Sequence, residues 1–177
     1  MFFRSFFYFL KNMEKLKYKQ IYCNKHALSN LRNLRTERIN RGITQTELSN
    51  MLDMTPDLLS NYELGINAPV LSTYIKLAVF FDWNLNKDTN YICYQMACSG
   101  KLKSWLQGQR GRYGYTVPEI SNRLNVSIQA VEPVFSKRYD RTSWPMVCRV
   151  YELFQQERQS EEIREKILTG RKIWRKH

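Results

Sequence analysis

The residue types that usually carry out catalysis or bind metals are sparse in this chain of 177 residues. Its histidines, His26 and His177, cannot complete a set of nucleophile, base and carboxylate, and no carboxylate pair stands apart from ordinary helix-surface acids. Four residues separate Cys93 from Cys98, which is not the spacing of a paired zinc knuckle. We therefore expect no enzyme activity, no metal site and no cofactor.

Basic residues supply the strongest chemical signal, because they are gathered in two blocks. The net charge of +12 divides into +8 in residues 1–43, −4 in residues 44–99 and +8 in residues 101–177. This arrangement would attract a polyanion at both ends of the chain, which makes nucleic acid the first candidate partner.

The cysteines and the apolar runs bear on location. The four cysteines are scattered, and a chain of this length can bury a core without disulfide bonds, so reduced thiols and a cytoplasmic location are expected. The apolar opening from Phe2 to Leu10 is short and is interrupted by Arg4. It is therefore expected neither to span a membrane nor to act as a secretion signal.

The elements that would position the functional residues are helices. The chain has 7 glycines and 5 prolines, too few for the turn-rich all-β architectures. Apolar spacing predicts an amphipathic helix from Leu28 to Arg41, with Arg38 among the arginines turned away from its apolar face. The sequence Thr44-Gln45-Thr46-Glu47 is a capping box that begins a second helix. A third helix is predicted over 56–64, and an apolar fourth helix after Pro69.

Residues from about 28 to 85 resemble the helix-turn-helix of the phage-repressor type (Cro/repressor, XRE-like). The resemblance is carried by Leu31-x-x-Leu34-Arg35, Gly42-Ile43-Thr44-Gln45-x-Glu47-Leu48, Met54-Thr55-x-x-x-Leu59-x-x-Tyr62-Glu63-x-Gly65 and Pro69-x-Leu71. It implies a five-helix domain whose third helix lies in the major groove of double-stranded DNA, while the start of the second helix contacts the backbone. It also implies a homodimer on a near-palindromic operator.

The same resemblance implies which side chains of this first unit contact DNA. By position, Gln45 would contact phosphate, and further contacts would come from Thr46, Thr55, Asp57, Ser60, Asn61 and Asn67. Asn61 could offer a bidentate donor and acceptor pair to adenine, whereas Asp57 could accept only from a cytosine amino group. An operator that tolerates A·T pairs is therefore expected.

This segment departs from the family pattern in its charge. No Lys or Arg lies between Gly42 and Ile75, although family members usually carry one in the loop after the third helix. Other parts of the chain would therefore have to contact the phosphates. Positions that are exposed in the family hold Leu58, Leu64 and Ile66. We expect these three to form an apolar patch that could dock a protein partner.

A shift of 72 residues aligns a second, degenerate copy, at about 101–155, with the first. Gly42 aligns with Gly114, and the capping box returns as Thr116-Val117-Pro118-Glu119. Another recognition helix is predicted from 128 to about 137, kinked or shortened by Pro133. The DNA contacts expected here are Ser127, Gln129, Lys137, Arg138 and Arg141, in a neighbourhood that also holds Arg110, Arg112 and Arg123.

The predicted organisation has five parts. Residues 1–26 form a basic, aromatic arm, 27–86 the first helix-turn-helix domain, 87–100 a linker, 101–157 the second helix-turn-helix-like domain, and 158–177 a charged helix and tail. The first twelve residues are either an upstream extension or a packed arm, and residues 91–98 are either a helical turn or a short strand. Ile163 and Ile167 of the last part, with the preceding Phe154, form either a dimer seam or a packing face.

Two functions are compatible with this all-α chain of two tandem repressor-like domains. The first is a sequence-specific DNA-binding transcriptional regulator, a repressor of bacterial, phage or mobile-element type. The alternative is a protein-interaction module on a helix-turn-helix scaffold, such as an antitoxin or an anti-defence inhibitor. Loss of DNA affinity with rising salt would favour the first, and no DNA binding at any salt would favour the second.

Overall fold

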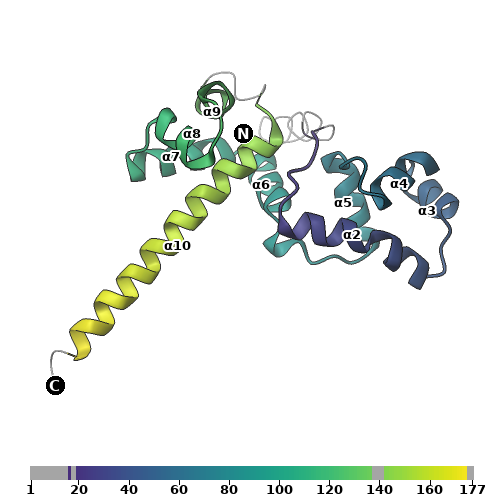
Figure 1. The fold of residues 1–177 in the computed structure, drawn as a ribbon, viewed down its shortest axis with the longest axis horizontal. Coiled ribbons are helices and arrows are strands. Elements are labelled where there is room, and N and C mark those ends of the chain that lie inside the picture. The colour runs from purple at the N-terminus through teal and green to yellow at the C-terminus, as the bar shows by residue number, and fades with distance from the viewer. Residues whose placement is uncertain (1–15, 17–18, 137–141, 175–177) are drawn as a thin grey trace, which may run out of the picture.

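The computed structural model describes residues 16, 19–136 and 142–174, with side chains up to 169 (Figure 1). The predicted all-α class is confirmed, because every element formed by these residues is a helix apart from one isolated β-bridge between Gln20 and Val70. The bridge ties residues 19–21 to the segment before α5, where the Leu71 N–H donates to the Lys19 carbonyl at 2.7 Å. None of the described helices is both long and apolar enough to cross a bilayer.

Four consecutive helices of the described chain follow the predicted order: α2 (Lys25–Asn40), α3 (Gln45–Leu52), α4 (Pro56–Glu63) and α5 (Leu71–Phe80). Thr44 and Glu47 cap α3 reciprocally, since the Glu47 carboxylate accepts from the Thr44 N–H at 2.7 Å and the Thr44 hydroxyl accepts from the Glu47 N–H. α3 ends at Leu52, and the next residue, Asp53, has a left-handed φ of 56° that turns the chain sharply toward Thr55, the cap of α4. Local chemistry thus builds the tight turn between α3 and α4.

The second copy repeats this local design. It consists of α7 (Leu102–Tyr113), α8 (Val117–Leu124) and α9 (Ile128–Phe135). Thr116 and Glu119 form a second capping box, and Asn125 takes a φ of 51° between α8 and α9, as Asp53 does between α3 and α4. The recognition helix of this copy is short, as predicted, with eight residues and Pro133 inside it.

The segment predicted as a linker, 87–100, is instead largely helical. It follows the 3-10 turn η1 (Leu85–Lys87) and contains α6 (Thr89–Cys98), which packs against α10 (Trp144–Trp174). Asn90 and Cys93 of α6 are fully buried. A short apolar run fits a strand or a buried helix equally well, so periodicity did not distinguish the two.

α10 joins two predicted parts into one helix of 31 residues. The sequence predicted an apolar helix from about 144 and a separate charged helix within 158–177. The helix continues because no proline or cap interrupts the chain between them. Its first half packs against α6, α7, α8 and α9, whereas its second half projects away from the other helices (Figure 1).

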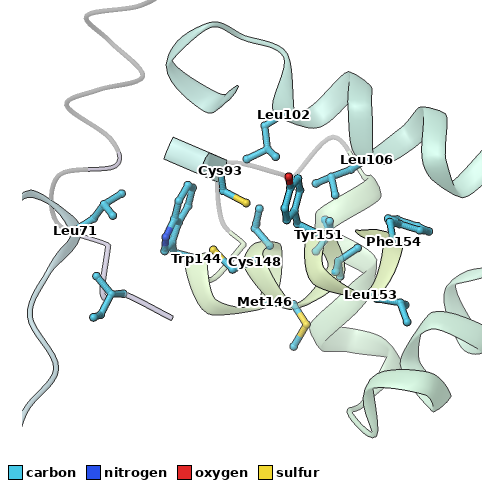
Figure 2. Packing of buried hydrophobic residues seen from close by; sticks show 14 of the residues in the cluster. Leu71, Cys93, Leu102, Leu106, Trp144, Met146, Cys148, Tyr151, Leu153 and Phe154 are labelled. Atoms are coloured by element: carbon cyan, nitrogen blue, oxygen red, sulfur yellow. The ribbon is translucent and has the colours of Figure 1, made fainter. Parts of the chain in front are cut away.

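Two hydrophobic clusters hold the fold together. The smaller lies within the first helix-turn-helix and contains Leu34, Leu48, Leu52, Leu59, Tyr62, Leu77 and Phe81. The larger extends from Ile21 and the start of α2 through α5 and α6 to α7–α9 and the first half of α10. Figure 2 shows Trp144, Cys148 and Tyr151 of α10 in this larger cluster, beside Cys93 of α6. Since the larger cluster crosses the predicted domain boundary, side-chain packing joins the two units.

A buried polar cluster lies at this junction. The Asp88 carboxylate is fully buried and accepts from the Tyr74 hydroxyl at 2.6 Å and from the Asn24 amide at 3.3 Å. Burial and the neighbouring Asp88 both raise the pKa of Tyr74, which keeps its hydroxyl protonated as a donor. The Asn90 side-chain carbonyl accepts from the Trp144 indole at 3.2 Å. Polar groups of α5, of α6 and α10, and of the caps that precede α2 and α6 thus satisfy one another in the interior.

Candidate nucleic-acid interface

The packing of α3 and α4 leaves the start of α4 on the surface. Leu48 of α3 and Leu59 of α4 are fully buried in the smaller cluster, and α3 and α2 both contact α4. Thr55, Pro56 and Asp57 at the beginning of α4 are exposed. A short helix presented in this way has the geometry needed to enter a major groove.

α4 is held against α2 by a buried ion pair. The side chains of Arg38 and Glu63 are 9% and 1% exposed, and Arg38 Nη2 donates to Glu63 Oε2 at 2.9 Å. Burial raises the pKa of Glu63, but hydrogen bonds from Arg38 and Gln45 outweigh this effect and hold the pKa below its ordinary value. The prediction that Arg38 turns away from the packed face is therefore wrong. Its carboxylate partner comes from another helix, which the pattern of α2 alone does not show.

Gln45, the predicted phosphate contact, takes part in the same cluster. It is half-buried, and its side-chain Nε2 donates to Glu63 Oε2 at 2.8 Å. An amide nitrogen carries two N–H groups, so one remains for an external acceptor. Glu63 thereby orients the side-chain amide of Gln45, the group for which the resemblance implies a contact with the DNA backbone.

The other predicted contacts of the first unit lie on α3, on α4 and in the loop after α4. Thr46, Thr55, Asp57 and Asn67 are exposed, whereas Ser60 and Asn61 are half-buried. The Thr55 hydroxyl is engaged as a cap, accepting from the Leu58 N–H at 3.3 Å. Within the described part of the chain, the side chains of Asp57, Ser60 and Asn61 make no hydrogen bond. Three polar side chains of α4 therefore keep their hydrogen-bonding groups for a ligand.

The predicted apolar patch is only partly exposed. Leu64 and Ile66 are 62% and 63% exposed, but Leu58 is half-buried and packs against the smaller cluster. The patch is thus formed by the residues that follow α4, next to the exposed Asn67.

In the second copy, Ser127 and Gln129 are exposed at the start of α9. Ser127 is the residue before α9, and its side chain makes no capping hydrogen bond to the start of that helix. Ile128, between them, is 46% exposed, so this helix start presents a mixed polar and apolar surface. The predicted contacts Lys137, Arg138 and Arg141 lie outside the described residues.

Two of the arginines near the second copy pair with acids of α10. Arg112 Nη2 lies 2.8 Å from Glu161 Oε2, and Arg123 Nη1 lies 2.6 Å from Glu157 Oε1. The arginine side chains remain 55% and 46% exposed. Because exposed ion pairs contribute only about 0–1 kcal/mol, a phosphate could replace either glutamate. Sequence reasoning missed this pairing, since the acids lie on a distant helix.

The described residues hold no group of three or more His, Cys, Asp or Glu side chains placed to bind a metal ion. The cysteines are free thiols, with Cys23 exposed and Cys93, Cys98 and Cys148 buried. The candidate site is formed by the Asp57, Ser60 and Asn61 side chains of α4, which make no hydrogen bond within the described chain.

Comparison with known proteins agrees with this geometry. Residues 34–85 match the helix-turn-helix family, a range that includes α3, α4, α5 and the end of α2. No curated protein and no solved structure matches the chain. The matched range includes both members of the buried Arg38–Glu63 pair and the exposed start of α4. Residues 34–85 therefore form a helix-turn-helix domain of the phage-repressor type.

Proposed function

We propose that this chain is a sequence-specific transcriptional regulator that represses genes by occupying a promoter. The observation that supports this function is α4, whose start is exposed and whose Asp57, Ser60 and Asn61 side chains have no hydrogen bond in the described chain. In the major groove, the Asn61 amide can both donate to and accept from adenine. The regulator would act in the cytoplasm as a homodimer, by recognition alone and without a cofactor.

Under this proposal, the second copy supplies the charge that the first lacks. Ser127 and Gln129 would face DNA at the start of α9, and Lys137, Arg138 and Arg141 would contact phosphates. Arg112 and Arg123 would break their ion pairs with Glu161 and Glu157 of α10 and form ion pairs with phosphates of the bound duplex. Each phosphate neutralised releases counterions, so affinity would fall steeply with salt.

The test begins by selecting bound duplexes from a random pool. Affinity for the selected duplex is then measured by fluorescence anisotropy at several salt concentrations. Asn61→Ala should relax base preference at one position by about 1–3 kcal/mol. Asn33→Ala, which changes an exposed asparagine of α2, is the matched control. An equal loss of affinity for all sequences would exclude Asn61 as a reading residue, and no binding at low salt would exclude the function.

The exposure of Leu64 and Ile66 favours one alternative, a protein-interaction module of the antitoxin or anti-defence type. An apolar pair beside the recognition helix suits a protein surface better than a phosphate backbone. Under this alternative, no DNA would be retained at any salt. Leu64→Ser with Ile66→Ser would then abolish binding to the protein partner, whereas the same change would leave base preference intact in a DNA-binding regulator.

A further inference from the structure

The arginines of α2 differ in the groups to which they are bonded. Arg38 is buried and bonded to Glu63, and Arg41 Nη1 donates to the Phe80 carbonyl at 2.8 Å. Arg35 is exposed, and it has no hydrogen bond or ion pair with any residue of the described chain. Its guanidinium therefore keeps its N–H donors for a partner from outside the chain.

Arg35 lies on the side of α2 that faces α4. It precedes Arg38 by three residues, and residues at this spacing are neighbours on a helix surface. Arg38 reaches Glu63 of α4 from this side. The pKa of Glu63 is raised by burial and lowered, more strongly, by its hydrogen bonds and by the charges of Arg38 and Arg35. The Arg35 guanidinium therefore lies close to the Glu63 carboxylate.

Two arginines beside one buried carboxylate leave a surplus of one positive charge. Arg38 and Glu63 neutralise each other, so the surplus belongs to Arg35 at the surface. The nearby acid of α2, Glu37, is directed elsewhere, because its carboxylate accepts from the Trp83 indole at 2.7 Å. A surplus positive charge at an exposed position attracts an anion.

The Gln45 side chain meets the same carboxylate. Its Nε2 donates to Glu63 Oε2 at 2.8 Å, and its second N–H remains for another acceptor. The loop after α4 carries no Lys or Arg that could bind the same anion. Arg35 and Gln45 thus bring a positive charge and a hydrogen-bond donor together next to α4.

We propose that Arg35 and Gln45 bind one phosphate of the DNA backbone together, so that α2 supplies the charge that the loop after α4 lacks. The inference rests on the proposed function, because its ligand is the phosphodiester of a bound duplex. It adds a contact from α2 to those that the resemblance implies. A phosphate contact positions the protein on the duplex and carries no base preference of its own.

The first test is the salt dependence of affinity, measured by fluorescence anisotropy with the full chain and the duplex selected from the random pool. Arg35→Gln removes one phosphate contact, so the log–log salt slope should become shallower by about 0.9, for all sequences alike. Between about 50 and 200 mM salt, the wild type should then lose about 3.5 times more affinity than the variant. Arg35→Lys keeps the charge and should keep the slope.

Arg32→Gln is the matched control. It makes the same change of charge at an exposed position of α2, but Arg32 precedes the buried Leu34 by two residues and so lies on the other side of the helix. Its slope should stay close to that of the wild type, and urea unfolding checks that both variants are folded. If the wild type binds steeply and Arg35→Gln changes the slope no more than Arg32→Gln, this inference fails and the proposed function stands. If the wild type binds no duplex, the proposed function itself fails.

The second test identifies the phosphate. Each phosphate of the selected duplex is replaced in turn by a neutral methylphosphonate, and affinity is measured for the wild type, Arg35→Gln and Gln45→Ala. At one position the replacement should weaken binding of the wild type and have a much smaller effect on both variants, because each has already lost part of that contact. Different positions for the two variants, or no such position for Arg35→Gln, would overturn the shared contact.

Discussion

Replacing Arg38 by Met tests whether the buried ion pair holds α4 in place. The change leaves the Glu63 carboxylate, 1% exposed, with the Gln45 amide as its remaining hydrogen-bond partner, and removes the donor to the Ile43 carbonyl. Removing one partner of a buried ion pair costs about 3–5 kcal/mol. A domain is stabilised by only about 5–15 kcal/mol, so the loss should be large. Urea unfolding followed by circular dichroism measures it.

A second variant separates the charge from the packing. Arg38→Met with Glu63→Leu leaves no stranded carboxylate, so it should be more stable than Arg38→Met alone. If Arg38→Met lowers the free energy of unfolding by less than about 1 kcal/mol, the buried ion pair does not hold α4 in place. The same conclusion follows if the double variant is less stable than Arg38→Met.

The pH dependence follows from the lowered pKa of Glu63 in the folded chain. The stabilisation from the pair is fully present above the ordinary value of 4.5 and is lost as pH falls through the lowered folded value. In Arg38→Met, protonation of the stranded Glu63 relieves the cost of its burial. The difference in unfolding free energy between wild type and Arg38→Met should therefore narrow as the pH is lowered from neutral toward 4.5 and below. A constant difference over this range would contradict the reasoning.

Three further predictions concern the second copy, the caps and the junction. Arg112→Gln with Arg123→Gln removes two proposed phosphate contacts, so the log–log salt slope for DNA binding should become shallower by about 1.8; an unchanged slope in the anisotropy assay would show that these arginines do not reach phosphates. Thr44→Ala and Thr116→Ala should each cost about 1 kcal/mol in urea unfolding, because each removes a capping box of the same geometry, and a cost for one but not the other would show that the copies are not equivalent. Asp88→Ala leaves buried donors without an acceptor and should cost about 1–3 kcal/mol or more, whereas a change below about 0.5 kcal/mol would mean that water reaches the cluster.

Short-range chemistry explains why the helices could be predicted. The capping boxes at Thr44 and Thr116 and the proline at the first position of α4 act within a few residues and need no tertiary partner. The short helices followed from these signals, and the resemblance of residues 28–85 to the phage-repressor helix-turn-helix is confirmed by the family match at residues 34–85. The same signals say little about 87–100, where α6 is fixed by burial against α10.

The sequence by itself therefore determined the short helices, the turns between them and the candidate reading residues of α4. Only the tertiary structure showed which polar groups remain available to a ligand. Arg38 is bound to a residue 25 positions away, Arg123 to one 34 positions away and Arg112 to one 49 positions away. Helical periodicity compares residues within one helix, whereas the availability of a charge depends on which distant groups packing brings within hydrogen-bond distance.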